Sequence, residues 1–177
     1  MSEYKKIILD KAKELRQQYS LGNYCGRSIF DVIEKIETDG GNILLFRLPF
    51  KNDDFAGFVG YKNNRFSIYT NTNKTLGYEI FTAAHEIFHI IENSTMIKEN
   101  MILEENTSDD KYEENDMSDV LADMFAAELL MPEEDISKEY NHLLDKNGLK
   151  KPNEVIIIML QQQYFVEYKA VTKGLKK

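Results

Sequence analysis

The chain has 177 residues and a net charge of −8, with 42% hydrophobic and 29% charged residues, which is typical of a globular protein with one domain and a small appendage. A net negative charge does not fit a protein that binds nucleic acid through a general basic surface, so direct nucleic-acid binding is not expected. No apolar run approaches the roughly 20 residues that cross a bilayer, and no signal-type segment follows Met1. We therefore predict a cytoplasmic protein that has no membrane partner.

Two helices are expected first. Residues 3–19 place apolar side chains at helical spacing, and Gly22 and Gly26 interrupt the pattern. Ser28 is a suitable N-cap for a second amphipathic helix, which the run Asp-Gly-Gly-Asn at 39–42 ends. The single cysteine, Cys25, lies between the two helices. It cannot form an internal disulfide, which fits a reducing cytoplasm, and we expect a buried thiol without a catalytic role.

Three strands are expected next, at residues 43–48, 55–61 and 65–70. Residues 62–64, Lys-Asn-Asn, have the composition of a hairpin turn between the second and third strands. The sequence therefore predicts a small antiparallel sheet of about three strands that packs against helices.

The segment that follows the strands contains His85-Glu86-x-x-His89. On a helix, residues four apart lie about 40° apart around the axis, so both imidazoles can face one metal ion. Glu86 lies beside them and can act as base to a metal-bound water. Ala84, Phe88 and Ile91 form the opposite, apolar face. The pentapeptide also occurs by chance, so a purely structural helix with a satisfied histidine pair is the competing interpretation.

After the motif, residues 93–115 are polar and acidic. They are expected to form either a lid over the active site or a solvated acidic loop. A helix is expected at 117–131, another helix starts after Pro132, and a third covers about 155–160. We divide the chain into a metallopeptidase domain at 1–140 and a C-terminal helical extension at 141–177.

A catalytic zinc ion takes three protein ligands and keeps one position open. Residues 90–95 contain no third histidine, so the pattern with three histidines at fixed spacing is excluded. A carboxylate from a second helix is the other solution. Asp119 and Asp123 share one helix face; Asp119 can bind the metal, while Asp123 can accept the spare N–H of a ligating histidine. Asp119 could instead be an ordinary acid of a helix first turn. If this helix begins earlier, the further candidates for the third ligand are Glu113, Glu114 and Asp116.

These motifs, in this order, resemble the ImmA/IrrE family of zinc metallo-endopeptidases. The resemblance covers about residues 28–135 and rests on three segments: 67–71 (Ser-Ile-Tyr-Thr-Asn), 81–89 with the two histidines, and 119–132 (Asp-Val-Leu-Ala-Asp-Met-Phe-Ala-Ala-Glu-Leu-Leu-Met-Pro). There are two departures. The family usually has Glu at the position of Asp119 and often Gly at the position of Phe88.

The resemblance implies a zincin-like α+β fold with the motif helix at its centre. It also implies a cytoplasmic hydrolase of phage or mobile-element type that cuts a helix-turn-helix transcriptional repressor. His85, His89 and Asp119 would hold Zn²⁺, and Glu86 would assist the attack of zinc-bound water. The alternative is a catalytically degenerate zinc-binding protein that acts by binding a repressor or another protein.

Two further parts of the site are expected. The substrate would pair with an edge strand at 65–71, where Ser67, Tyr69 and Asn71 lie. The candidates for a donor to the oxyanion are Tyr112 and His142. Residues 160–171 have a spacing similar to a helix-turn-helix, but two plain packing helices explain it better.

Overall fold

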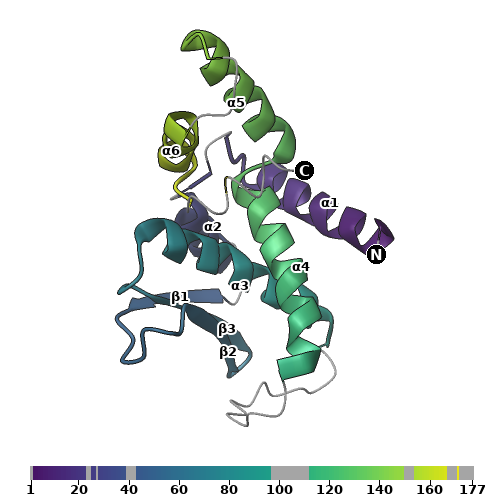
Figure 1. The fold of residues 1–177 in the computed structure, drawn as a ribbon. Helices are drawn as coiled ribbons and strands as arrows, with labels where there is room; N and C mark the ends of the chain where they lie inside the picture. The colour runs from purple at the N-terminus through teal and green to yellow at the C-terminus, as the bar shows by residue number, and fades with distance from the viewer. Residues whose placement is uncertain are drawn as a thin grey trace.

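The computed structural model describes residues 2–22, 25–26, 28–38, 43–96, 112–149, 154–166 and 171. Within these residues the chain forms six helices and one three-stranded sheet, so the predicted α+β class is confirmed (Figure 1). The elements are α1 (Ser2–Gln18), α2 (Ser28–Thr38), β1 (Ile43–Leu48), β2 (Gly57–Lys62), β3 (Arg65–Asn71), α3 (Leu76–Met96), α4 (Tyr112–Leu130), α5 (Glu133–Lys146) and α6 (Glu154–Tyr164).

The motif helix α3 lies in the middle of the molecule. The sheet packs against α2 and α3, α4 packs on α3, and α1 packs on α4. Figure 1 shows the sheet at one end and α5 and α6 at the other, with α3 and α4 between them. Because α3 contacts both the sheet and α4, its side chains can form a site together with either neighbour.

The sheet is mixed, which corrects the expected antiparallel arrangement. Its strand order is β1-β3-β2, with β1 parallel and β2 antiparallel to β3. Asn63 and Asn64 both have positive φ angles, 53° and 60°, as a tight two-residue hairpin requires, so β2 and β3 pair as predicted. Residues 49–56 lead from β1, at one edge of the sheet, to β2 at the other edge. After the hairpin, β3 lies between these two strands and is parallel to β1.

The strand at 65–71 is therefore not an edge strand, and the expected substrate position at Ser67, Tyr69 and Asn71 is wrong. Both sides of β3 are paired, while one edge of β2 has no partner strand among the described residues. The Asn71 side chain instead organises the preceding loop. Its Oδ1 accepts the N–H of Phe50 at 3.1 Å, and its Nδ2 donates to the carbonyl of Phe55 at 2.9 Å.

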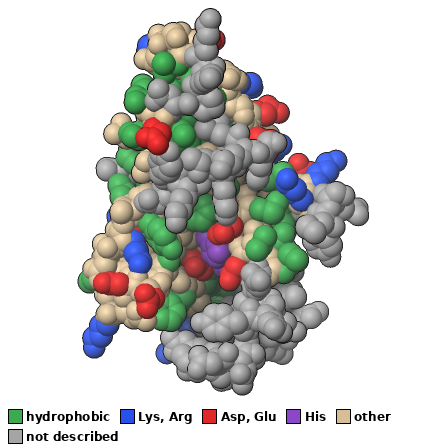
Figure 2. All heavy atoms as spheres, viewed as in Figure 1, with side chains coloured by type: hydrophobic (Ala, Val, Ile, Leu, Met, Phe, Trp, Pro, Cys, Tyr) green, Lys and Arg blue, Asp and Glu red, His purple; other side chains and the backbone are tan. Residues whose placement is uncertain are grey.

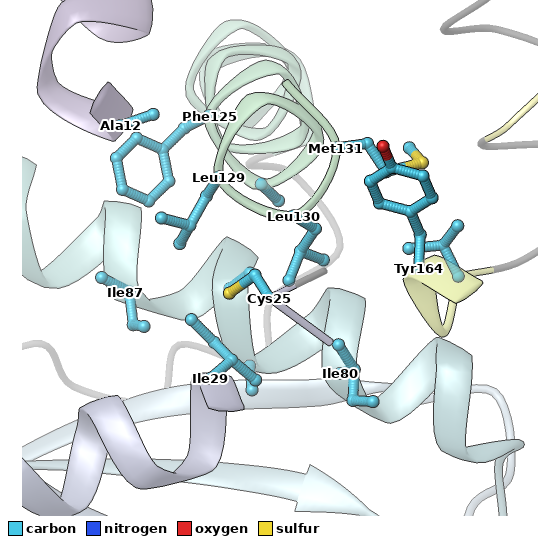
Figure 3. Packing of buried hydrophobic residues seen from close by; sticks show 14 of the residues in the cluster. Ala12, Cys25, Ile29, Ile80, Ile87, Phe125, Leu129, Leu130, Met131 and Tyr164 are labelled. Carbon is cyan, nitrogen blue, oxygen red and sulfur yellow. The ribbon is translucent and has the colours of Figure 1, made fainter. Parts of the chain in front are cut away.

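The buried core joins α2, α3 and α4, as Figure 3 shows. Ile29 of α2, Ile87 of α3 and Phe125 of α4 are all fully buried. Cys25 lies in the same core, and burial raises the pKa of its thiol to about 11. The thiol therefore stays protonated at neutral pH and behaves as a small apolar side chain, as expected.

The helices around the acidic segment are longer than their apolar patterns predict. α3 continues to Met96, and α4 begins at Tyr112 rather than at 117. Acidic side chains favour the first turn of a helix, so α4 can begin before its apolar pattern does. The remainder of the predicted lid, residues 97–111, lies outside the described part of the chain. The expected domain boundary at 140 falls inside α5, and α5 packs against α6.

A buried carboxylate ties the first turn of α3 to the sheet. Arg47 of β1 donates two hydrogen bonds to Glu79, from Nε at 2.7 Å and from a terminal nitrogen at 2.8 Å. The hydroxyl of Thr70 of β3 donates a third, at 2.9 Å. The hydrogen bonds from Arg47 hold the pKa of Glu79 below its ordinary value. The charged form of Glu79 therefore stabilises the fold.

We expect Glu79→Gln to lower the thermal midpoint of unfolding at neutral pH, because Arg47 loses its charged partner. A depressed pKa contributes stability above the ordinary value of about 4.5 and loses it as the pH falls through the lowered value. The difference in midpoint between wild type and variant should therefore narrow at acidic pH. Thermal unfolding followed by circular dichroism across this range measures it. A difference that stays constant would contradict the expected role of the charge.

Candidate metal centre

The two histidines of the motif face a space between three elements. Ala84, Ile87 and Phe88 on the core side of α3 are buried, and this apolar stripe sets the rotation of the helix. His85 and His89 are left half-buried beside this stripe, where they face Asp119 and Asp123 of α4. The amphipathic pattern of α3 thus positions the imidazoles.

The structure brings His85, His89 and Asp119 together. The Nε2 atoms of the two histidines are 3.0 Å apart. The Asp119 Oδ1 atom lies 3.8 Å from Nε2 of His85 and 3.4 Å from Nε2 of His89. These are three potential ligand atoms from two helices that lie next to each other.

The outer nitrogen of each histidine has a polar partner of its own. Nδ1 of His85 lies 3.0 Å from Oδ1 of Asp123, the contact expected for that residue. Nδ1 of His89 lies 3.4 Å from the hydroxyl of Ser118, which donates to Oε2 of Glu92 at 2.7 Å. Sequence reasoning missed Ser118 and Glu92. The only signal was their spacing, one residue before Asp119 and three after His89.

This donor set fits a metal ion. A proton on each Nδ1, as their acceptors favour, leaves both Nε2 lone pairs aimed at the same point and next to a carboxylate. Such lone pairs repel unless a cation or a proton lies between them. Ligands about 2.1 Å from a tetrahedral ion are about 3.4 Å from each other, close to the observed separations of 3.0–3.8 Å. His85, His89 and Asp119 could therefore hold a divalent ion with little movement.

Glu86 is the least exposed ionisable group of the centre, at 7%. Burial raises its pKa to about 7, the charge of His85 opposes this shift, and Asp119 adds to it. For His85, burial lowers the pKa, but the hydrogen bond to Asp123 and nearby carboxylates bring it above the ordinary value. Burial and the charge of His85 lower the pKa of His89. A carboxyl group with a pKa near neutrality can exchange protons at physiological pH.

The centre opens into a cavity of about 560 Å³. One wall is the segment Ala56–Val59, which includes the start of β2, and the other wall is α4 with Ser118, Asp119 and Asp123. Figure 2 shows histidine at the bottom of this hollow, with acidic side chains around it. The volume suits part of an extended peptide.

A family model with the description IrrE N-terminal-like domain, Peptidase_M78, matches residues 39–176. The chain belongs to this peptidase family. The resemblance read from the motifs is thereby confirmed, and a metallopeptidase-family role follows. No curated protein matches the sequence significantly.

A transcriptional regulator of Mycobacterium tuberculosis is similar in structure, with a TM-score of 0.59 and 15% sequence identity. The similarity covers 94% of this chain and 45% of the regulator, so the chain spans less than half of that protein's length. At this identity the likeness shows a shared fold. None of the described helices is long and apolar enough to cross a membrane.

Two residues differ from the usual pattern of the IrrE-like family, and the structure places both. Phe88 is 3% exposed and packs against Phe125 of α4, with ring centroids 5.6 Å apart. Its ring thus stabilises the contact of α3 with α4 and does not line the cavity. The Asp119 side chain reaches both histidines but remains 57% exposed.

Of the two expected oxyanion donors, the structure places only the His142 side chain. His142 lies exposed on α5 and outside the cavity lining, so the structure corrects its expected role. The sequence position of a single histidine does not indicate whether its side chain lies near the candidate metal centre. Tyr112 begins α4, but its side chain lies outside the described residues, as do those of the alternative ligands Glu113, Glu114 and Asp116.

Gly57 allows β2 to lie directly against α3 at the cavity. A Cβ atom at this position would be 2.4 Å from the Tyr69 carbonyl oxygen and 2.5 Å from a methyl carbon of Thr82. No larger residue fits without movement of the strand. Because Gly57 has no side chain, the start of β2 can approach α3 closely and line the same cavity as the histidines.

We expect Gly57→Ala to lower the free energy of unfolding by about 1–3 kcal/mol, the usual cost of overpacking. Chemical denaturation measures this loss. Gly60→Ala on the same strand is the matched control, because its Cβ would lie 3.5 Å from the Tyr69 ring, an ordinary contact. Equal stability of the two variants would contradict the close approach of β2 to α3.

Proposed function

We propose that this protein is a zinc-dependent metallo-endopeptidase that cuts a helix-turn-helix transcriptional repressor. The observation that carries the proposal is the meeting of three ligand atoms from His85, His89 and Asp119, beside the buried Glu86, in one cavity. Membership of a peptidase family supports the reaction type. The repressor as substrate is supported by the resemblance of the motifs to the ImmA/IrrE family.

Each residue of the centre has a task in peptide hydrolysis. His85, His89 and Asp119 would hold zinc, which when bound supplies a Lewis acid that polarises a peptide carbonyl and makes water more acidic. Glu86 takes a proton from the attacking water onto its carboxylate. It then gives the proton to the amine nitrogen as the C–N bond breaks.

The residues around the ligands keep the imidazoles in place. Asp123 accepts the Nδ1–H of His85, and Ser118 accepts that of His89 while it donates to Glu92. These partners select the tautomer in which Nε2 is free for the metal. Burial raises the pKa of Glu86 to about 7, and a divalent ion held by the three ligands would lower this pKa and favour the carboxylate form that accepts a proton.

The free edge of β2 is the place for the substrate backbone. No strand of the described residues pairs with this edge, and the first residues of β2 line the cavity next to His85 and Glu86. An extended peptide that pairs with β2 would bring one of its carbonyl groups beside the centre. This position replaces the one expected along β3.

The test combines metal analysis with a cleavage assay. Zinc-loaded protein is incubated with a repressor encoded beside its gene, and the products are identified by mass spectrometry. We expect one zinc ion per chain, one or a few defined cuts, and no cutting after the metal is chelated. A protein that takes up no zinc on titration would contradict the proposal.

A second candidate is a degenerate relative that binds its repressor without cutting it. The exposure of Asp119 favours it, since a short and solvent-exposed carboxylate holds a metal less firmly than a buried glutamate. In that case the zinc-loaded protein would form a stable complex with the repressor and leave it intact.

A further inference from the structure

A row of stacked aromatic rings crosses the face of the sheet that points away from α2 and α3. Phe46 of β1, Tyr69 of β3 and Phe58 of β2 are direct cross-strand neighbours. The ring centroids of Phe46 and Tyr69 are 5.0 Å apart and those of Tyr69 and Phe58 are 4.6 Å apart, and both pairs are inclined by 14°. The rings form a continuous stack from one edge of the sheet to the other.

The row lies on the outer face because side chains alternate along a strand. Ile68 and Thr70, the neighbours of Tyr69, are fully buried, and Thr70 bonds to Glu79 of α3. The end rings of the row, by contrast, are exposed: Phe46 at 38% and Phe58 at 40%. Exposed apolar side chains that lie together on one face are a feature of interaction surfaces.

The row reaches the candidate centre at its β2 end. Phe58 belongs both to the row and to the lining of the cavity, and β2 has an edge there that no strand of the described chain pairs with. A peptide paired with that edge alternates its side chains between the two faces of the sheet. One side chain enters the cavity, and the next one falls on the outer face beside Phe58.

We propose that Phe58 is a specificity-determining residue, which selects substrates with an aromatic or large aliphatic side chain next to the residue that enters the cavity. The inference rests on the proposed function, because it takes the occupant of the β2 edge to be the extended segment of a protein substrate. The Phe58 ring contacts Tyr69 and also Phe50, at a centroid distance of 5.9 Å and an angle of 42°, yet it stays 40% exposed. A ring at this position would pack on that exposed part of Phe58, and cross-strand aromatic pairs are favourable.

A single-stranded nucleic acid is the other class of ligand that stacks on aromatic rings. The described surface does not favour it. The middle ring of the row already has its faces covered by its neighbours, and the adjacent cavity is acidic, with Glu86, Glu92, Asp119 and Asp123 in its lining. The net charge of −8 adds to the repulsion of phosphates.

The test measures binding apart from cutting. A positional-scanning library of capped peptides, long enough to cover β2, is bound to the zinc-loaded Glu86→Gln protein, and the retained sequences are read by mass spectrometry. We expect a preference for Phe, Tyr, Trp or Leu at one position. In the Phe58→Thr background this preference should disappear, and the best peptide should bind about tenfold more weakly by fluorescence anisotropy.

Phe46→Thr is the matched control. Phe46 has nearly the same exposure as Phe58 and lies in the same row, but at the edge away from the cavity. Threonine suits an exposed strand position, and circular dichroism checks the fold of both variants. We expect Phe46→Thr to bind the best peptide within about twofold of the parent protein, since cross-strand effects fall off beyond direct neighbours.

Four outcomes would overturn the inference: retention of no peptide, an unchanged preference in Phe58→Thr, equal weakening in both variants, or tighter binding of a labelled single-stranded oligonucleotide than of any peptide. The proposed function is tested separately, by cutting of the selected peptides with wild-type protein. Cutting without dependence on Phe58 leaves the proposed function standing and removes this inference. Phe58-dependent binding without cutting supports this inference and contradicts the proposed function.

Discussion

Replacing Glu86 with glutamine should lower the rate of peptide cleavage by about 10²–10⁴-fold, the usual contribution of a general acid–base group. Glutamine has nearly the same shape, but it cannot accept a proton from water. Glu86 makes none of the three ligand contacts, which come from His85, His89 and Asp119. The zinc content of the variant should therefore equal that of the wild type, and cleavage kinetics together with metal analysis measure both effects.

Glu92→Gln is the matched control for this variant. Glu92 also lines the cavity, on the same helix, but its carboxylate accepts from Ser118 beside His89. We expect it to weaken zinc binding and to retain turnover once the protein is saturated with metal, because the proton acceptor is still present. If Glu86→Gln cut the repressor as fast as the wild type, Glu86 would not be the base.

Replacing Asp119 with alanine should weaken zinc binding by more than the roughly 10–100-fold that is typical when a hydrogen-bond partner of a ligand is lost. The reason is that Asp119 supplies the only carboxylate among the three ligand atoms that the described residues bring together. Competition with a zinc-binding dye measures the affinity. Because the Asp119 side chain is 57% exposed, the fold should tolerate the change, which thermal unfolding of the metal-free protein checks.

Two further variants show how Asp119 acts. Asp119→Glu restores the residue that is usual in the family and should bind zinc at least as tightly as the wild type. Asp123→Asn keeps all three ligands but removes the charged acceptor of His85, so zinc affinity should fall by about 10–100-fold. An Asp119→Ala protein with the affinity of the wild type would show that the third ligand lies elsewhere.

Much of the candidate ligand set could be predicted from sequence because it depends on local geometry. The spacing of His85 and His89 places them on one helix face whatever the helix packs against. The same holds for Asp119 and Asp123 on α4, and for the hairpin at Asn63 and Asn64, where the turn residues alone select the pairing. The structure brings these pairs together in the way that their spacing indicates.

The errors concern contacts between elements that are distant in the chain. Ser118 and Glu92 look like ordinary surface residues of two helices. Glu92 follows His89 by about one turn of α3, but only the packing of α4 on α3 places Ser118 beside both of them. His142 was one of three histidines and therefore a natural candidate, yet α5 leads it away from the cavity. Residue types without a spacing rule give no information about their spatial neighbours.

The sequence by itself determined that helices carry the centre, that the two histidines share one helix face with Glu86 beside them, and the peptidase family. Only the tertiary structure decided which strand has the free edge beside the centre. Side-chain alternation assigns a strand two faces but does not name its neighbours, so Ser67 and Tyr69 could not be placed at an edge or in the middle from their pattern. That choice depends on the path of residues 49–56 and on the close approach of β2 to α3 that Gly57 permits.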